Sequence, residues 1–414
     1  MISKNFIRQS YQQILPYQSK IIDTFTEICY AIILAKSLNV SEIARHLPQN
    51  RIRGKDKGKL RSFNSIYKWL NRKLEDLATK CDWNILFSLL HNEVEFLIGD
   101  PTEIERLYSY KTDYVGKLKV GERGYTLLSI SAPFEGRALP IYFLLYSSSL
   151  IEQEKTSRNL KHKEAFEKII QILREIPIVL DREFAYESLI HFFRLYLCKF
   201  IIRLTDKKVK LYYDNKKKQE VSLSIQPSEL KVIKNVYYKG KEKVNLIGFW
   251  DPKYHKPLWL ITNMDDPEKC IEIYQKRMRI EEMFRDIKSY FSIEDNMTRK
   301  LSKLETLLFL FCLTYHIIAI TGYVTKHQFI TNNNFKKKYS EIFLILFFDF
   351  RHLNINKETI IQIYQKTLEY IYIRPIVKGS ATEFLVFLLR KFRKNVHSDS
   401  PRIWDKEENH HEHP

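Results

Sequence analysis

The order of apolar runs between residues 93 and 204 constrains the fold more than any other feature of the chain. Short runs rich in Val, Ile, Leu and Phe are typical of buried strands, whereas apolar residues three or four positions apart are typical of helices. In chain order the runs are EVEFLIGD (93–100), YTLLSISAPF (125–134), ALPIYFLLY (138–146), the helical run 161–174 and IPIVLD (176–181). A helix over 185–196 and a strand over 198–204 follow. The order β-β-β-α-β, with a hairpin turn at Glu135-Gly136, predicts a mixed sheet with helical crossovers.

Two aspartates, Asp100 and Asp181, close strand-like runs of this series. An acidic residue at the carboxyl end of a strand emerges at the edge where open α/β sheets bind ligands. Either aspartate alone is equally consistent with a helix cap or a turn. A third acid, Glu281, lies on a later helical run, and three acids from separate elements favour a site for hard divalent cations.

The run from Tyr274 to Phe291 (YQKRMRIEEMFRDIKSYF) places four polar groups at steps of three, four and seven residues. On a continuous helix these steps return Tyr274, Arg277, Glu281 and Lys288 to nearly one face. A carboxylate flanked by cations on one face suits a site that holds a metal ion and a nucleic-acid phosphate together. The alternative is a solvated helix face with ordinary charge pairs. The adjacent Glu282 is about 100° round the helix and is not expected to share that face.

The strand order and the three acids resemble the ribonuclease-H-like fold and the DDE triad of cut-and-paste transposases. Tyr274, Arg277, Glu281 and Lys288 match the Tyr-Arg-Glu-Lys signature of one bacterial insertion-sequence group, and Asp181-Arg182-Glu183 resembles its second-acid motif. The resemblance covers roughly residues 90 to 320. It implies an α/β fold with a mixed sheet flanked by helices and interrupted by a β-rich insertion, with helical regions at both ends of the chain.

The resemblance also implies a chemistry and a role for each residue. Asp100, Asp181 and Glu281 would be catalytic and would bind two Mg²⁺ ions, for which Mn²⁺ can substitute, with Asp100 bridging both ions. Arg277 and Lys288 would grip DNA phosphates, and Tyr274 would hydrogen-bond a phosphate or stack. The implied reaction is cleavage of double-stranded DNA through a hairpin, followed by joining to target DNA. Two transposon ends must be paired, which implies a homodimer.

The chain divides by composition into segments. We expect a helical DNA-binding region at residues 1–85 and a catalytic core at 90–204 and 266–324, the second part carrying the Glu281 helix. We expect a β-rich insertion at 205–265, a helical C-terminal region at 325–395 and a disordered tail at 396–414. The first region ends in the basic run KGKLRSFNSIYKWLNRKL, which loosely resembles a helix-turn-helix reader, with Ser41 as the expected cap of its short helix. Its candidate DNA contacts are Lys57, Lys59, Arg61, Lys68, Arg72 and Lys73, and a solvated basic helix is the alternative.

Charge and cysteine content narrow the partner and the compartment. The formal net charge is +19, which favours a polyanionic partner or a membrane surface. The five cysteines form no CxxC pair, so we expect no disulfide framework or zinc site and a reducing prokaryotic cytoplasm near the nucleoid. The uncharged run Leu307–Val324 is long enough to span a membrane, but we favour a core helix packed behind the Glu281 helix and no membrane partner.

Three other functions compete with a transposase. A ribonuclease-H-like nuclease would cut DNA without joining it, and a repressor derived from a transposase would bind DNA without cutting it. A membrane protein would use the run Leu307–Val324 as a span. The complete triad and signature argue against the repressor. Joined DNA products would distinguish a transposase from a nuclease, and detergent dependence would indicate a membrane protein.

Overall fold

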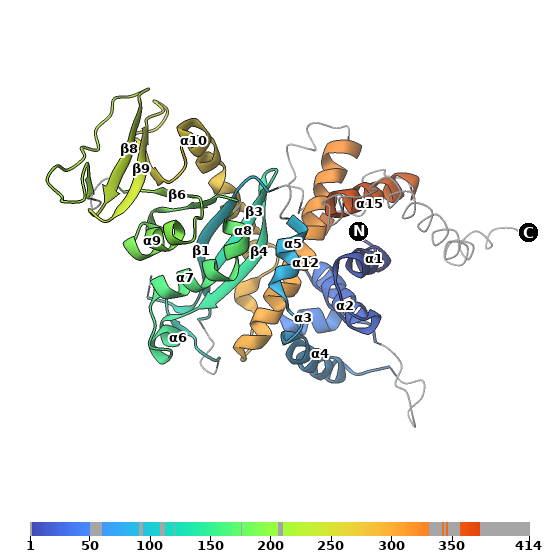
Figure 1. Cartoon of the computed structure of the whole chain (residues 1–414). Coiled ribbons are helices and arrows are strands. Elements are labelled where there is room, and N and C mark those ends of the chain that lie inside the picture. Colours follow the sequence, from blue (N-terminus) through green and yellow to red (C-terminus); the bar gives the residue numbers. More distant parts are fainter. Residues whose placement is uncertain are drawn as a thin grey trace, which may run out of the picture.

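The structure is a computed structural model that describes residues 2–49, 60–90, 94–107, 112–119, 121–174, 176–205, 210–330, 342, 345–346 and 357–372. A large sheet and its flanking helices form one part of the molecule, and helices from both ends of the chain gather round one long helix in the other (Figure 1). The expected tail at 396–414, and much of the expected region at 325–395, lie outside the described residues.

Five helices precede the sheet: α1 (Lys4–Ile14), α2 (Ser19–Ala35), α3 (Val40–His46), α4 (Phe63–Ala78) and α5 (Trp83–Leu90). The expected cap at Ser41 is wrong, because Asn39 caps α3 by accepting a hydrogen bond from the Ser41 backbone N–H at 2.9 Å. Ser62 caps α4 in the same manner. The basic helix of the sequence therefore begins at Phe63.

The core of the sheet consists of β1 (Leu97–Glu105), β3 (Arg123–Phe134), β4 (Arg137–Tyr146), β5 (Ile178–Leu180) and β6 (Phe200–Arg203). Their order in space is β4-β3-β1-β5-β6. The β1–β3 and β3–β4 pairs are antiparallel, whereas the β1–β5 and β5–β6 pairs are parallel. This is the mixed, ribonuclease-H-like sheet with a hairpin and helical crossovers that the sequence predicts.

Three local features differ from the expectation. A short strand β2 (Gly116–Lys117) pairs with β3, and a helix α6 (Ser148–Gln153) follows β4. The helical run 161–174 is divided into α7 (Arg158–Lys168) and α8 (Ile170–Leu173), because Ile169 leaves helical geometry with φ −112° and ψ 18°. Helix α9 (Glu187–Leu195) precedes β6 as expected.

The β-rich segment after β6 extends the same sheet. Strands β10 (Leu258–Thr262), β9 (Glu242–Phe249), β8 (Leu230–Tyr238) and β7 (Leu211–Tyr212) continue outward from β6 in that order. The run 221–225, which alternates like a strand, forms none. Trp259 is 1% exposed, and a Cβ on Gly248 of β9 would clash with its ring, so this tryptophan belongs to the core.

The expected single helix from Tyr274 to Phe291 is wrong. The structure has α10 (Pro267–Gln275), a 3₁₀ turn η2 (Lys276–Met278) and α11 (Arg279–Ser289), followed by a second 3₁₀ turn η3 (Ile293–Asp295). The 3₁₀ turn changes the direction in which successive side chains leave the backbone. Spacing alone therefore does not fix where the four signature residues point.

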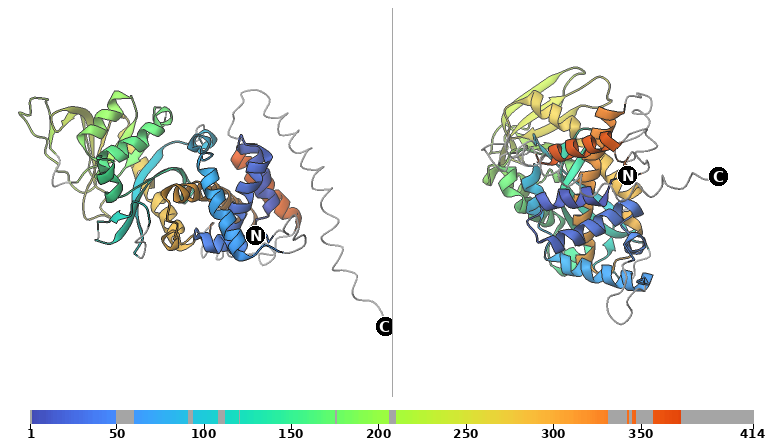
Figure 2. Two further views of the ribbon diagram at one scale, coloured as in Figure 1. Left: turned by 90° about the horizontal axis from the view of Figure 1, so that it is seen from below. Right: turned by 90° about the vertical axis from the view of Figure 1, so that its right-hand side faces the viewer.

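Helix α12 (Leu301–Val324) is the central element of the molecule and continues into the π-helical turn η4 (Thr325–Phe329). Among the described residues, one helix is long and apolar enough to cross a membrane, and it is this continuous helix from Leu301 to Phe329. However, 94% of its most apolar stretch is buried inside the protein. It packs against α2, α4, β4 and α15 (Lys357–Tyr372). The predicted core helix is therefore correct, and helices cover both faces of the sheet (Figure 2).

Candidate active site

Asp100 and Asp181 are neighbours on adjacent parallel strands. Leu97, Ile98 and Gly99 of β1 pair in register with Ile178, Val179 and Leu180 of β5, and the next residue on each strand is the aspartate. Paired strands lie about 4.8 Å apart, so the two carboxylates start from adjacent backbone positions. Strand β1 does not end at Asp100, as the sequence suggested, but runs on to Glu105 in its pairing with β3. The parallel pairing ends at this point, which leaves both aspartates at one edge.

The surroundings of Asp100 make its negative charge costly. The Asp100 side chain is 14% exposed. Burial raises its pKa to about 7 against the opposing charge of Arg277, and the charges of Asp181 and Glu183 add to the rise. A raised pKa that depends on nearby carboxylates is typical of sites in which several acids converge.

Two of the signature residues contact the aspartates directly. The Tyr274 hydroxyl, on α10, donates a hydrogen bond to Asp181 Oδ1 at 3.3 Å. Arg277, on η2, donates from Nη1 to Asp100 Oδ2 at 2.6 Å and from Nη2 to Glu281 Oε1 at 3.0 Å. Tyr274 and Arg277 thus contact three acids: one on β1, one directly after β5 and one on α11.

Arg277 does not have the open position that the sequence suggested for a phosphate ligand. Its side chain is 7% exposed, and its guanidinium bridges Asp100 and Glu281. Burial lowers the pKa of Arg277, but the charges of Asp100 and its neighbours more than compensate and raise it above the usual value. In this arrangement Arg277 neutralises the acids, and Tyr274, which is 8% exposed, orients Asp181.

Lys288 lies apart from this group. Its Nζ contacts Glu294 Oε1 at 3.1 Å, and Glu294 Oε1 also accepts a hydrogen bond from the backbone N–H of Glu105 at 3.4 Å. Lys288 is thus beside the far end of β1, and its side chain is 33% exposed. Lys288 is therefore partly exposed, and its ammonium pairs with Glu294 and not with the three acids.

A second charged cluster borders Asp181, and most of its members could not be identified from sequence patterns. Arg158 at the start of α7 pairs with Glu183, and Lys119 Nζ lies 3.3 Å from the same Glu183 oxygen. On the other side, Arg203 Nη1 is 4.0 Å from Asp181 Oδ1. Glu183 was visible in the motif Asp181-Arg182-Glu183, but the three cations come from distant segments. Two of them pair with Glu183, and Arg203 lies beside Asp181.

A buried ion pair between Asp286 and Arg137 holds helix α11 in place. Asp286 has a fully buried side chain, and its Oδ2 accepts a hydrogen bond from the Tyr315 hydroxyl of α12 at 2.7 Å and lies 3.2 Å from Arg137 Nε. Arg137 also pairs with Glu282, which confirms that Glu282 faces away from Glu281. Burial raises the pKa of Asp286 to about 6 against the opposing effects of Arg137 and Tyr315. This anchor fixes the helix that carries Glu281.

The N-terminal basic residues are on α4 or beside it, remote in sequence from the acids. Lys68 and Arg72 are exposed, and Arg61 is half-buried just before the helix. The exposed rings of Phe63 and Tyr67 stack with centroids 6.1 Å apart. Lys57 and Lys59 lie outside the described residues.

The donor set at Asp100, Asp181 and Glu281 fits hard divalent cations, because all three groups offer carboxylate oxygens. In the arrangement observed, however, no three acidic, histidine or cysteine side chains among the described residues are close enough to ligate one ion. The Arg277 guanidinium stands between Glu281 and Asp100. Glu281 is 46% exposed. The three carboxylates therefore suit a divalent cation in their chemistry, while Arg277 pairs with two of them in this arrangement.

Residues 136–317 match the family model described as "Transposase DDE domain". The matched segment contains Asp181 and Glu281 and runs from the β3–β4 turn into α12, while Asp100 lies before it. A comparison with curated proteins gave no match. A comparison with solved structures includes a cryo-EM structure of a piggyBac transposase synaptic complex with hairpin DNA, at 11% identity and a TM-score of 0.41, covering 95% of this chain and 82% of that one.

Proposed function

We propose that the protein is a DDE transposase that excises and inserts an insertion sequence of the Tyr-Arg-Glu-Lys group by cut and paste. The observation that carries the proposal is the position of Asp100 and Asp181 on adjacent parallel strands, linked through Arg277 and Tyr274 to the helix of Glu281. The match of residues 136–317 to a transposase DDE domain supports the same conclusion.

The chemistry proposed for this site is phosphoryl transfer on DNA. Asp100, Asp181 and Glu281 would hold two Mg²⁺ ions, which supply charge neutralisation at the phosphate and activate the attacking oxygen. In the first step water attacks the phosphodiester, its proton leaves to solvent, and the P–O3′ bond breaks to free a 3′-OH. That hydroxyl then attacks a phosphodiester of the opposite strand, so that a new P–O3′ bond closes a hairpin while the P–O3′ bond to the flanking DNA breaks and leaves a 3′-OH there. Water breaks the P–O3′ bond of the hairpin and frees the 3′-OH of the transposon end again. This 3′-OH attacks a target phosphodiester, whose own P–O3′ bond breaks and leaves a 3′-OH on the target strand.

The residues around the acids would position the DNA. Arg277 would exchange its bond with Glu281 for a phosphate when DNA arrives, because a planar guanidinium serves carboxylates and phosphates equally well. Lys288 would contact a neighbouring phosphate along β1. Lys59, Arg61, Lys68 and Arg72 would bind the transposon end, two subunits would pair two ends, and the protein would act on the nucleoid in the cytoplasm.

The experiment that tests the proposal uses the full chain and DNA that carries the inverted repeats found beside its gene. With Mg²⁺ we expect excision, a hairpin intermediate and joined products on a target plasmid. Cleavage without joined products would indicate a nuclease instead. Binding without any cleavage would indicate a repressor, and both results would contradict the proposal.

A further inference from the structure

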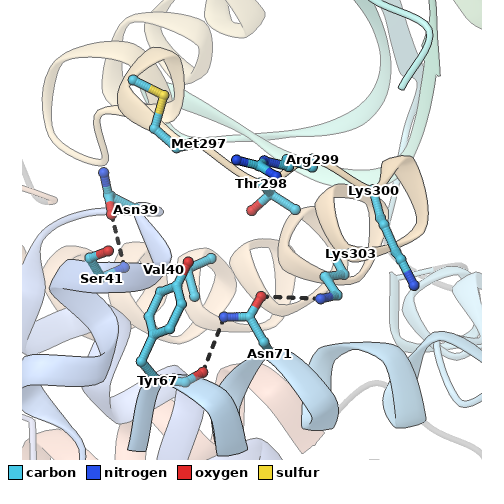
Figure 3. Close-up of a pocket in the computed structure, with 10 residues that line it drawn as sticks. All are labelled: Asn39, Val40, Ser41, Tyr67, Asn71, Met297, Thr298, Arg299, Lys300 and Lys303. Carbon is cyan, nitrogen blue, oxygen red and sulfur yellow. Dashed lines mark hydrogen bonds between the residues drawn. The ribbon is translucent and has the colours of Figure 1, made fainter. Parts of the chain in front are cut away.

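A pocket of about 460 Å³ lies between the N-terminal helices and the start of α12, away from the three acids. Its lining comes from three segments: the α3 entry, the exposed face of α4, and the stretch that joins η3 to α12. Figure 3 shows the lining residues, which are Asn39, Val40, Ser41, Tyr67, Asn71, Met297, Thr298, Arg299, Lys300 and Lys303. The pocket therefore joins the basic N-terminal region to the segment that follows the Glu281 helix.

The wall formed by Arg299, Lys300 and Lys303 is cationic. Lys300 pairs with Glu75, and Lys303 Nζ lies 3.5 Å from the same carboxylate. One carboxylate thus serves two lysines, and among the described residues no acidic side chain forms an ion pair with Arg299. The charge of Asp113 also acts on Lys300. Three cations against these two carboxylates leave a net positive charge at this wall, which favours an anionic ligand.

The backbone at the same wall offers further donors. Lys300 is the N-cap residue of the 24-residue helix α12, and no side chain caps the first turn of that helix. Free N–H groups and the positive end of a long helix favour an anion at this position.

A buried hydroxyl in the pocket has no partner. Thr298 is 7% exposed, and its Oγ1 is buried without a hydrogen bond. Figure 3 shows this hydroxyl directed into the space between α3 and α4. A buried hydroxyl without a partner is costly, so its position indicates a ligand that accepts a hydrogen bond.

The frame of the pocket is rigid. The Asn296 side chain is fully buried and donates to the Leu38 carbonyl at 2.7 Å, while Asn39 Nδ2 donates to the Asp295 carbonyl at 2.8 Å. The Leu38 N–H donates to the Phe291 carbonyl at 2.7 Å. These bonds fasten the α2–α3 connection to the segment after α11, so the pocket walls keep their spacing.

We infer that this pocket binds a phosphodiester of the DNA backbone, at a point where one strand passes from α4 towards the acids. The inference rests on the proposed function, since it assigns a further DNA contact to the same enzyme. On α4, the exposed Lys68 and Arg72 each directly follow a lining residue of the pocket, Tyr67 and Asn71. The pocket walls are hydrogen-bonded to the segment that follows α11, so a phosphate bound in the pocket has a defined position relative to that segment. The pocket thereby fixes the DNA relative to the Glu281 helix.

The test measures the affinity of the full chain for a short labelled DNA duplex over a range of salt concentrations, by fluorescence anisotropy. Arg299→Gln should reduce the slope of log K against log[salt] by about 0.9, the value for one lost phosphate contact. Thr298→Val keeps the shape and the backbone but loses the hydroxyl. It should weaken binding about tenfold without changing the slope, as expected for one hydrogen bond to a charged group. Lys168→Gln, which removes an exposed charge at the end of α7, is the matched control and should change neither quantity.

The outcomes separate this inference from the proposed function. If both pocket variants bind DNA with the same affinity and the same salt slope as the wild type, the pocket assignment is wrong and the transposase proposal still stands. A wild-type protein that does not bind DNA would overturn both. A titration with inorganic phosphate at constant ionic strength tests whether the pocket binds a free anion instead. If free phosphate saturates the pocket and the variants lose phosphate binding but keep DNA binding, the site takes a free anion and the DNA contact is wrong. Equal thermal unfolding of all variants would show that folding is intact.

Discussion

The anchor beneath the Glu281 helix gives a stability prediction that the structure makes quantitative. Tyr315→Phe removes one hydroxyl, which donates to the fully buried Asp286 carboxylate at 2.7 Å, and leaves the ring and its packing in place. A hydrogen bond to a charged group contributes about 1.5–3 kcal/mol. Asp286 Oδ1 lacks a hydrogen-bond partner among the described residues, so the variant leaves the carboxylate with the ion pair to Arg137 at 3.2 Å.

The pH dependence of this loss follows from the pKa of Asp286. Burial raises that pKa to about 6, while Arg137 and the Tyr315 hydroxyl hold it down. Because the folded pKa is above the unfolded value, the protonated carboxyl stabilises the fold, and this contribution is lost as pH rises through about 6. Without the hydroxyl the pKa of Asp286 in the folded protein should rise further, by about 1 to 2 pH units. Each pH unit corresponds to about 1.4 kcal/mol of unfolding free energy. As pH rises, the Tyr315→Phe variant therefore continues to lose stability up to about pH 8. The difference in unfolding free energy between wild type and variant should appear above about pH 6.

The measurement is equilibrium urea unfolding of wild type and Tyr315→Phe at about pH 5.5 and about pH 8.5, followed by tryptophan fluorescence. We expect a difference of about 1.5–3 kcal/mol at the higher pH and a much smaller one at the lower pH. In an Asp286→Asn background, Tyr315→Phe should show no such pH dependence. An equal cost at both pH values in the wild-type background would refute the assigned role of the hydroxyl.

Three further predictions concern the signature and the basic helix. Arg277→Gln should slow Mg²⁺-dependent cleavage at least tenfold, which corresponds to about 1.4 kcal/mol. It should also raise the Mn²⁺ affinity of the DNA-free protein, because Glu281 loses the guanidinium that holds it. Unchanged Mn²⁺ affinity in a calorimetric titration would contradict this. Lys288→Gln should leave Mn²⁺ affinity unchanged and reduce the salt slope of DNA binding by about 0.9; weaker metal binding would place Lys288 at the metal site. Lys68→Gln and Arg72→Gln should each reduce that slope by about 0.9 as well, and a slope equal to that of wild type would remove α4 from the DNA interface.

The strand order and the positions of the two aspartates were predictable because they depend on local patterns. Apolar runs indicate buried strands, and the parallel pairing of β1 with β5 ends just before Asp100 and Asp181, which places both at one level of the sheet. The buried helix α12 was predictable for a similar reason: a long uncharged run in a chain with a large sheet is best accommodated in the core.

Only part of the site contacts was predictable. The Arg277–Glu281 contact is the i,i+4 pair that helical spacing predicts. The contact of Arg277 with Asp100 and the pairing of Lys288 with Glu294 depend on the folded chain. A spacing argument places all four residues on one face and assigns both cations to phosphates. Likewise, Arg158 and Lys119 are distant from Glu183 in sequence, and only the folded chain brings them together.

The central claim is that Asp100, Asp181 and Glu281 together hold the divalent ions of one phosphoryl-transfer site, and counting bound Mn²⁺ tests it most directly. Electron paramagnetic resonance titration of the DNA complex should show two Mn²⁺ ions per subunit in the wild type. Asp100→Asn should lose both ions, because this residue bridges them, whereas Asp181→Asn and Glu281→Gln should each lose one. Wild-type Mn²⁺ binding by Asp100→Asn would contradict the account.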